Sequence, residues 1–329
     1  MRYIGPADIA RLHAEGVITM TDYVEAIHAV YRDKGEGGVQ VVPRANLWAE
    51  ENRPGTRPRS LKIAGALTGA LGVMGTVAYS AGYGGGGIDL WIQLFSTTTG
   101  EAVALLHGGE LSLWKTGATA AVAARAMSRP ESGVVAIIGT GRFARTQLTG
   151  LMAVRTITEL RCYSRGESGR EAFAQWAKSI VGDATVRATA SAREAVEAAD
   201  IVVTVTTSRS PALEGAWLAP GTHCNAVGMH YPDMREIDTF AVQRSRVIVD
   251  DIDQALQEKG ELLIPLRAGD IGREHILGEL GDVLCGRVQA RDSREAITLF
   301  CSGGVAIEQL ASCAMVARKA GEAGIGALV

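Results

Sequence analysis

Aromatic side chains are scarce in this sequence, and neither sign of charge dominates it. Phe, Trp and Tyr make up 5% of the 329 residues, and 33 basic residues stand against 36 acidic ones, for a formal net charge of −3. A protein that binds nucleic acid ordinarily has a basic surface and rings on which bases stack. We therefore expect no nucleic acid among its partners. An apolar share of 47% also excludes a disordered chain.

Cysteine is rare as well, and its positions form no recognisable pattern. The five cysteines are scattered, without a C-x-x-C pair or a histidine at zinc-like spacing. An odd number of this kind is typical of reduced thiols in a cytosolic protein. The first residues contain no apolar stretch of secretory type. We expect a cytoplasmic protein without disulfides or a metal site.

Long apolar runs are also missing. Residues 63–88 include no charged side chain, but nine of them are Gly, and Thr, Ser and Tyr interrupt the rest. A helix that crosses a membrane needs about 20 residues that are much richer in Leu, Ile, Val and Phe. The sequence therefore predicts no membrane segment.

The N-terminal part of the chain predicts a lobe rich in β-structure. Residues 8–32 have the spacing of two short amphipathic helices, and Gly- and Pro-rich turns then separate short strand-like runs. These runs are 39–42, 45–48, 60–63, 76–80, 88–95 and 102–106, with turns at 54–58 and 84–87. An alanine-rich helix is predicted from about residue 111 to 127.

From residue 133 the pattern changes to strands that alternate with helices. The apolar run 134–138 is typical of a strand covered on both faces. Further strands are predicted at 159–163, 185–188, 201–206, 222–227, 246–249 and 297–300, and helices at 143–152, 170–180, 192–199 and 305–319. Such alternation predicts a doubly wound parallel sheet. At roughly 150 residues per domain the chain has two domains, and the fold class is α/β.

Residues 134–144, V-V-A-I-I-G-T-G-R-F-A, read as a strand, a G-x-G-x-x-A loop and the start of a helix. In such a loop Gly139 permits the tight turn, Gly141 lets backbone N–H groups approach a pyrophosphate, and Ala144 allows close helix–strand packing. A purely structural glycine turn is the alternative. The residues predicted to bind a dinucleotide here are Gly139, Thr140, Gly141, Arg142 and Phe143.

The end of the second strand of this domain predicts which dinucleotide is bound. Residues 163–166 read Y-S-R-G and include no acid that would bind an adenosine ribose and repel a 2′-phosphate. Arg165 can pair with a phosphate in a fork, and Ser164 can donate one more hydrogen bond. We therefore predict NADP(H) in preference to NAD(H). The alternative is that Arg165 is a solvated loop charge.

Several further motifs occur in a fixed order along the chain. They are Pro43-Arg44, the strand residue Lys62, K-T-G-A at 115–118, the phosphate loop, N-A-V-G at 225–228 with Pro232 and Arg235-Glu236, and F-C-S-G-G-V-A-I-E at 300–308. With these motifs the chain resembles the ornithine cyclodeaminase/mu-crystallin family over nearly its whole length.

That resemblance implies a homodimer of two-domain subunits. Residues 1–116 and 305–329 would form a discontinuous substrate-binding and dimerisation domain, and residues 117–304 a Rossmann domain. Members of the family include cyclodeaminases, imino-acid reductases, amino-acid dehydrogenases and a hormone-binding crystallin.

The resemblance also implies that Arg44 and Lys62 bind the substrate carboxylate. Lys62 is the only charged residue between Arg59 and Asp89, so we expect it in an apolar environment. Burial favours a neutral amine, which suits proton transfer with an imine nitrogen. The alternatives are a snorkelling lysine at position 62, and a surface ion pair of Arg44 with Glu50 or Glu51.

Two positions depart from the family pattern. The helix that usually begins R-T-A-A begins here with Lys115, which keeps a charge for carboxylate and cofactor but lacks the arginine fork. Where cyclodeaminases have an aspartate, this chain has His230. An imidazole can move a proton, but it is no permanent anion for a distal ammonium group. A plain loop residue is the alternative for His230.

The remaining candidates are weaker. By resemblance, Thr206 and Ser302 would face the cofactor, and Gly303, where the family often has valine, would enlarge the substrate pocket. Cys301 is expected to pack rather than to act as a nucleophile. Asp250-Asp251 is expected to be a solvated strand end rather than a metal site.

Together these residues predict an NAD(P)H-dependent reductase of 2-imino acids, in which Lys62 and His230 are catalytic. Two alternatives remain. One is a cyclodeaminase-type lyase with tightly bound NAD, and the other is a non-catalytic, crystallin-like protein that binds NADPH and a small carboxylate. The sequence does not name the imino or amino acid.

Overall fold

The computed structural model describes residues 1–49, 59–83 and 89–329. These residues form two compact units, Met1–Lys115 with Gly304–Val329, and Thr116–Gly303. The chain leaves the first unit within helix α3 (Gly109–Met127) and returns to it after strand β14 (Ile297–Cys301). Within the described ranges, no helix is long and apolar enough to cross a membrane.

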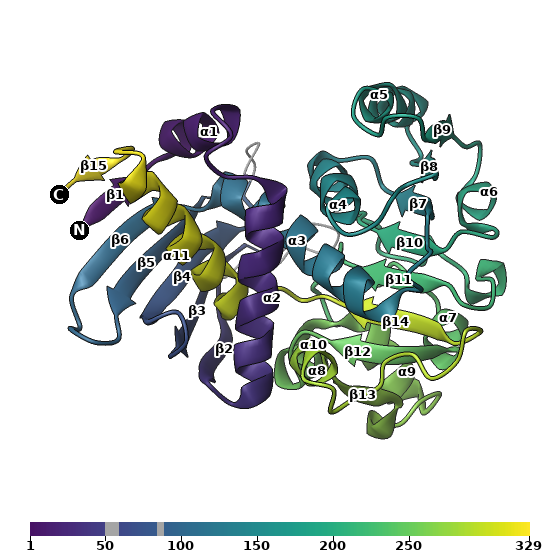
Figure 1. The fold of residues 1–329 in the computed structure, drawn as a ribbon. Helices are drawn as coiled ribbons and strands as arrows, with labels where there is room; N and C mark the ends of the chain where they lie inside the picture. The colour runs from purple at the N-terminus through teal and green to yellow at the C-terminus, as the bar shows by residue number, and fades with distance from the viewer. Residues whose placement is uncertain (50–58, 84–88) are drawn as a thin grey trace. The chain divides into compact units, whose positions relative to one another are not determined.

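A seven-stranded sheet forms the centre of the first unit (Figure 1). Its strands are β1 (Arg2–Ile4), β2 (Val39–Trp48), β3 (Ser60–Thr68), β4 (Val73–Ala81), β5 (Leu90–Ser96), β6 (Ala102–His107) and β15 (Ala327–Leu328). Their order is β15-β1-β6-β5-β4-β3-β2, and only β1 and β6 pair in parallel. The sequence did not predict β1 and β15, because strands of two or three residues are too short to show alternation.

Three helices complete this unit: α1 (Pro6–Ala14), α2 (Met20–Glu36) and α11 (Ala306–Glu322). Helices α2 and α11 contact each other and lie across one face of the sheet (Figure 1). A capping box fixes the start of α2, because Thr19 and Asp22 each accept a hydrogen bond from the other's backbone N–H. Gly37, with φ +85°, ends this helix in the left-handed conformation that favours glycine.

The predicted strands 39–42 and 45–48 are a single strand, β2. Its pairing with β3 shifts register between Val42 and Ala45, around Pro43-Arg44. Proline has no N–H group for the ladder, so a bulge at this point lets the strand continue. The predicted turns at 54–58 and 84–87 lie outside the described residues.

The second unit is built on an eight-stranded sheet in which every pair is parallel. Its strands are β7 (Val134–Ile138), β8 (Glu159–Tyr163), β9 (Thr185–Ala188), β10 (Ile201–Thr204), β11 (His223–Ala226), β12 (Ser245–Val249), β13 (Ile276–Glu279) and β14. The order is β13-β12-β14-β11-β10-β7-β8-β9. The run β9-β8-β7-β10-β11 follows the Rossmann order 3-2-1-4-5, and confirms the predicted doubly wound sheet.

The helices of this unit cover both faces of its sheet. They are α4 (Arg142–Met152), α5 (Glu167–Lys178), α6 (Ala192–Val196), α7 (Thr239–Gln243), α8 (Ile252–Glu258), α9 (Gly260–Ala268) and α10 (Leu280–Leu284), with the main part of α3. Along β7, Val135 and Ile137 belong to one apolar cluster, and Ala136 and Ile138 to the other. This two-sided burial explains the continuous apolar run.

Most differences from the predicted elements are at their ends. Helix α6 ends at Val196 rather than at 199, and β10 ends at Thr204 rather than at 206. The sequence also missed β13 and the short helices α7 to α10. Elements of four to nine residues give too little periodicity to be recognised.

Candidate functional site

Lys62 lies on the helix-covered face of the first unit's sheet. It is 5% exposed, whereas its neighbours on β3, Leu61 and Ile63, are 42% and 38% exposed. In the antiparallel register Lys62 is opposite Asn46 on β2 and Tyr79 on β4, so the three side chains share one face. The expected burial of Lys62 is therefore present in the structure.

Arg44 joins this group from β2. Its Nη1 atom donates to the Tyr79 hydroxyl at 2.8 Å, and its Nη2 atom donates to the carbonyl of Gly304 at 2.5 Å. Sequence reasoning missed Tyr79, whose only signal was its inward position on an alternating strand. Glu50 and Glu51, the partners in the alternative for Arg44, lie outside the described residues.

Lys115 is buried in α3, and its ammonium forms an ion pair with Glu308. Glu308 is fully buried in the first turn of α11, where the helix dipole favours a carboxylate. Its second oxygen accepts a 2.5 Å hydrogen bond from Tyr31. A Cβ atom on Gly304 would lie 2.9 Å from Lys115 Nζ, so Gly304 lies close to both Lys115 and Arg44. Sequence reasoning gave Glu308 no role, although it ends the 300–308 motif.

The phosphate loop of the second unit has the predicted strand–turn–helix form. Gly139 has φ +102°, and a Cβ atom there would lie 2.5 Å from the Val205 carbonyl oxygen. Gly141 is the N-cap of α4, and a Cβ atom there would meet nothing within 4 Å among the described residues. Ala144 is fully buried against the strands. The loop is therefore tight at its first glycine and open at its second, as close approach of a pyrophosphate requires.

The other predicted residues of this region surround the same helix end. Arg142 is exposed and Phe143 half-buried at the start of α4, where N–H groups point along the helix axis. The hydroxyls of Thr140 and Ser164 are 2.8 Å apart, which joins the loop to the end of β8. Arg165 is exposed, and its guanidinium has no hydrogen-bond partner among the residues that the structure describes. These donors fit a dinucleotide phosphate.

The remaining candidates of the second unit lie at the carboxyl edge of its sheet. Thr206 is two residues beyond β10, half-buried His230 is four residues beyond β11, and buried Ser302 and Gly303 directly follow β14. Since all of these strands are parallel, their carboxyl ends share the edge at which Gly139 follows β7. Ligands of open α/β sheets bind at this edge.

The prediction for Asp250 was wrong. This carboxylate is fully buried, and it accepts hydrogen bonds from the amides of Asp251, at 2.9 Å, and Gly303, at 2.5 Å. Asp251 instead caps α8, through a 2.9 Å hydrogen bond from the Gln254 amide. Two adjacent aspartates after a strand do not by themselves reveal which one points inward. Among the residues placed by the structure, no three His, Cys, Asp or Glu side chains could together hold a metal ion.

Cys301 is fully buried at the end of β14, as expected for a packing residue. Burial raises the pKa of its thiol well above the ordinary range, which opposes a nucleophilic role. Sequence reasoning also gave no role to Glu236, which is a fully buried carboxyl. Burial, together with the charge of Glu261, raises the pKa of Glu236 to about 7. Hydrogen bonds from Thr206 lower this pKa but do not cancel the rise.

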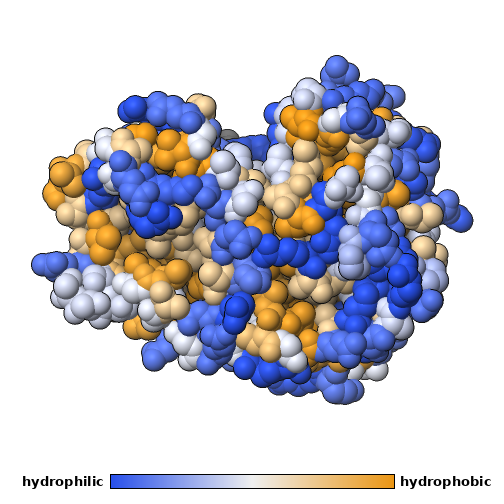
Figure 2. Space-filling view, in the orientation of Figure 1, coloured by the Kyte–Doolittle hydropathy of each residue, from blue (hydrophilic) through white to orange (hydrophobic). Residues whose placement is uncertain are grey.

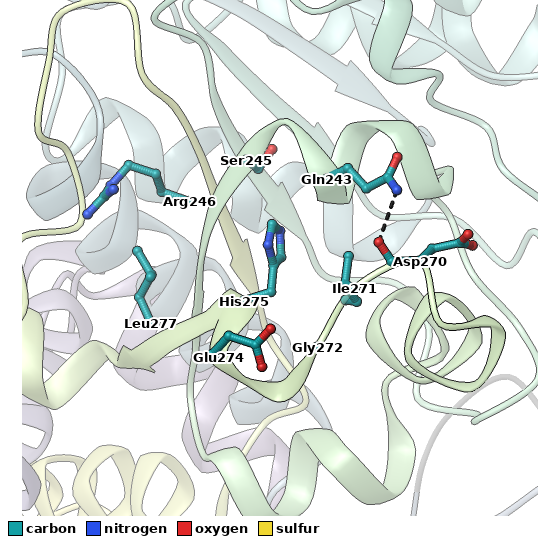
Figure 3. A pocket seen from close by; sticks show the side chains of 9 residues that line it. All are labelled: Gln243, Ser245, Arg246, Asp270, Ile271, Gly272, Glu274, His275 and Leu277. Atoms are coloured by element: carbon teal, nitrogen blue, oxygen red, sulfur yellow. Dashed lines mark hydrogen bonds between the residues drawn. The ribbon is translucent and has the colours of Figure 1, made fainter.

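Two hollows lie away from all of these residues. One of about 550 Å³ lies at the amino ends of β12 and β13 (Figure 3). Two of its polar side chains already contact backbone carbonyls: His275 Nε2 is 2.7 Å from the Val242 carbonyl, and the Gln243 amide donates to the Asp270 carbonyl at 3.1 Å. The other, of about 640 Å³, lies on the first unit beside α11, where Figure 2 shows many apolar side chains. No predicted site residue lines either hollow.

Sequence comparison identifies relatives of known activity. The model of the ornithine cyclodeaminase/mu-crystallin family matches residues 10–324. A Delta(1)-pyrroline-2-carboxylate reductase from Bacillus cereus is 36% identical over 236 residues, which cover 71% of this chain and 72% of that protein.

Two solved structures have the same fold. Thermococcus litoralis Delta(1)-pyrroline-2-carboxylate reductase, in complex with NADH and L-proline, is 29% identical, with a TM-score of 0.91 and 100% of both chains covered. An archaeal alanine dehydrogenase dimer with bound NAD is 27% identical, with a TM-score of 0.90, and covers 100% of this chain and 98% of its own. The chain belongs to the ornithine cyclodeaminase/mu-crystallin family, as its motifs predicted.

Proposed function

We propose that this chain is an NAD(P)H-dependent reductase of 2-imino acids, which reduces the imino carbon to that of an amino acid. The observation that supports this best is the pair of cations, Arg44 and Lys62, on the helix-covered face of the first unit's sheet. An imino acid presents a carboxylate next to a C=N bond. It therefore needs one group that holds an anion and another that donates a proton to nitrogen.

Arg44 is the proposed carboxylate-binding residue. Its hydrogen bonds to Tyr79 and Gly304 fix the plane of the guanidinium before any substrate arrives. A donor whose orientation is fixed loses little entropy when it binds, and it orients the C=N bond through the carboxylate. Lys115 is proposed to contact the same carboxylate. An ammonium has three N–H donors, so its ion pair with Glu308 is compatible with a further bond.

Lys62 is the proposed acid. In its protonated form, the buried Lys62 side chain supplies the proton that the imine nitrogen receives, and protonation of nitrogen makes the carbon a better hydride acceptor. Reduced nicotinamide, when bound, supplies the hydride. The first unit thus binds and protonates the imino acid, and the second unit holds the cofactor.

His230 limits the choice of substrate. A neutral imidazole can pass a proton to or from solvent near neutral pH, but it does not compensate a distal ammonium group. We therefore propose a substrate with a neutral or acidic side chain, and Delta(1)-pyrroline-2-carboxylate, the substrate in the name of the Bacillus relative, is the first candidate.

The proposed cofactor is NAD(P)H, bound by the phosphate loop, Thr206 and Ser302. Two relatives of known structure hold NADH or NAD. Exposed Arg165, with Ser164 beside it, supports a preference for the 2′-phosphate of NADPH.

Arg165→Ala is expected to weaken NADPH binding by about tenfold or more and NADH binding by less than about threefold, because one phosphate fork is lost. Fluorescence titration with each cofactor measures both affinities. Lys178→Ala, an exposed lysine in the last turn of α5, is the matched control and should change neither. Equal weakening of both cofactors would show that Arg165 does not contact a 2′-phosphate.

We also propose a cytoplasmic homodimer. The outer face of the first unit's sheet exposes large apolar side chains side by side in the strand register: Leu47, Leu61, Ile63 and Trp91. Such a patch is typical of a protein interface, and the archaeal alanine dehydrogenase is a dimer. All five cysteines are free thiols, which supports a reducing compartment.

A spectrophotometric assay tests the proposed function. Purified protein mixed with NADPH or NADH and Delta(1)-pyrroline-2-carboxylate should consume the reduced cofactor in step with formation of proline. Release of ammonia from ornithine without net change of cofactor would instead indicate a lyase. Thermal stabilisation by NADPH without turnover of any imino acid would indicate a binding protein.

A further inference from the structure

The second unit buries four ionisable side chains next to the carboxyl edge of its sheet. Glu236, Asp250, Lys259 and Glu261 are each fully buried. We name this group the buried charge clamp. Charged groups are expensive to remove from water unless they are paired and hydrogen-bonded. Their partners therefore indicate what the group does.

Glu236 joins the ends of β10 and β11. One carboxylate oxygen accepts the Thr206 amide at 2.5 Å. The other oxygen accepts hydrogen bonds from the backbone N–H group of Gly228, at 2.6 Å, and from the Thr204 hydroxyl, at 3.2 Å. A Cβ atom on Gly228 would lie 2.4 Å from the Thr206 carbonyl oxygen, so the two loops are in close contact. A single side chain thus fixes the backbone before Thr206 and before His230.

Lys259 joins the end of β11 to the end of β14. Its Nζ atom donates to the Met229 carbonyl at 2.6 Å and to the Ser302 carbonyl at 3.2 Å. Burial is the largest single effect on the pKa of Lys259 and lowers it, but the nearby acidic groups together outweigh burial and raise that pKa, Glu261 most strongly with its carboxylate 3.4 Å away. The ammonium therefore stays charged, and both of its carbonyl contacts are charge-assisted.

Asp250 and Glu261 complete the clamp. Asp250 accepts the Gly303 amide at 2.5 Å, which joins the end of β12 to the residue after Ser302. Glu261, in the first turn of α9, accepts a 3.1 Å hydrogen bond from the backbone N–H group of Glu236, and its carboxylate faces Lys259. Every member therefore holds either a loop backbone or another member.

These links follow the order of the sheet. The strands lie in the order β12-β14-β11-β10, and the clamp joins β12 to β14, β14 to β11, and β11 to β10. The loops that it joins are those that present Thr206, His230 and Ser302. The phosphate loop after β7 has no member of the clamp among its described hydrogen-bond partners.

We propose that Glu236 and Lys259 are positioning residues, which hold the loops after β10, β11 and β14 in one fixed arrangement for the nicotinamide end of the cofactor. This inference rests on the proposed reductase function. Neither residue touches a reacting atom. Each acts through the backbone on the neighbouring Thr206, His230 and Ser302.

Glu236→Gln tests the clamp. The amide keeps the size of the side chain but turns one acceptor into a donor, which would face a backbone N–H group. We expect kcat for imine reduction to fall by about 10- to 100-fold, as for small misplacements of reacting groups. We expect the Kd of NADH to change by less than about threefold, because the phosphate loop is untouched.

Amide hydrogen exchange gives a second measurement, which needs no substrate. Residues 204–209, 227–231 and 301–303 should exchange about tenfold faster in Glu236→Gln, while residues 135–145 stay unchanged. Lys259→Met combined with Glu261→Gln, which removes one charge of each sign, should have the same effect on exchange. If Glu236→Gln does not fold, Glu236→Asp replaces it in both measurements. Aspartate keeps the charge, but its shorter side chain cannot reach the amides of both Thr206 and Gly228.

Thr298→Val is the matched control. Thr298 is fully buried on β14, near the amino end of the same sheet, and its hydroxyl is 2.9 Å from His223 Nδ1. This variant should lower Tm without changing kcat. Unchanged hydrogen exchange in the three loops of Glu236→Gln would overturn the proposal. A Glu236→Gln variant that, like the control, has a lower Tm but an unchanged kcat would overturn it as well. A wild-type protein that reduces no imino acid would refute the proposed function, and the exchange measurement would still decide whether the clamp holds the loops.

Discussion

Replacing Lys62 with methionine is expected to lower kcat for imine reduction by about 10²- to 10⁴-fold, the usual contribution of a positioned general acid. Methionine has a similar length and a flexible side chain that adapts to a buried position, so the fold should remain intact. Without the ammonium, the imine nitrogen has to take its proton from solvent. The binding of NADPH to the second unit should not change.

Stopped-flow or steady-state absorbance at saturating cofactor measures the loss, and circular dichroism with a Tm measurement checks the fold. Leu67→Met is the matched control, because Leu67 lies on the same strand, points to the opposite face of the sheet and is outside the apolar patch named above. A Lys62→Met variant that keeps kcat within about threefold of the wild type would remove Lys62 from the mechanism.

Alanine at the two glycines of the phosphate loop is expected to have opposite consequences. Gly139→Ala should lower the free energy of unfolding by about 2 kcal/mol or more, because alanine is strained at a positive φ and its Cβ atom would strike a backbone carbonyl. Gly141→Ala should change that free energy by less than about 0.5 kcal/mol, because nothing described lies within 4 Å of the new atom.

The same pair separates folding from cofactor binding. The methyl group of Gly141→Ala would occupy the space in which backbone N–H groups meet a pyrophosphate, so the Kd of the dinucleotide should rise by about tenfold or more. Urea unfolding and fluorescence titration measure the two effects. Unaltered NADPH binding by a well-folded Gly141→Ala variant would mean that the loop is only a structural turn.

Local patterns in the sequence determined the second unit's sheet and loop. Strands 134–138, 159–163 and 185–188 have the predicted bounds, because apolar runs between turn residues reflect burial on both faces. The need for glycine at positions 139 and 141 could also be predicted locally, because a backbone conformation or a close approach restricts which residue fits at one position. The absence of any other charge around Lys62 likewise predicted its burial.

The pairing of charges was decided only by the tertiary structure. Glu308 is 193 residues from Lys115 along the chain, and Gly304 is 260 residues from Arg44. No period of 2 or 3.6 residues relates such positions. The sequence predicted that Lys62 is buried, but it could not show that Lys115 has a buried carboxylate as its partner.

Asp250 illustrates the same limit most clearly. A charged residue after a strand is ordinarily solvated, and only the packing of α8 and of the loop after β14 encloses this one. What the sequence by itself determined is the local geometry: which segments are strands, where glycine is required, and which family the chain resembles. Which polar groups meet inside the molecule was decided by tertiary packing, because burial selects partners by position in space rather than by distance along the chain.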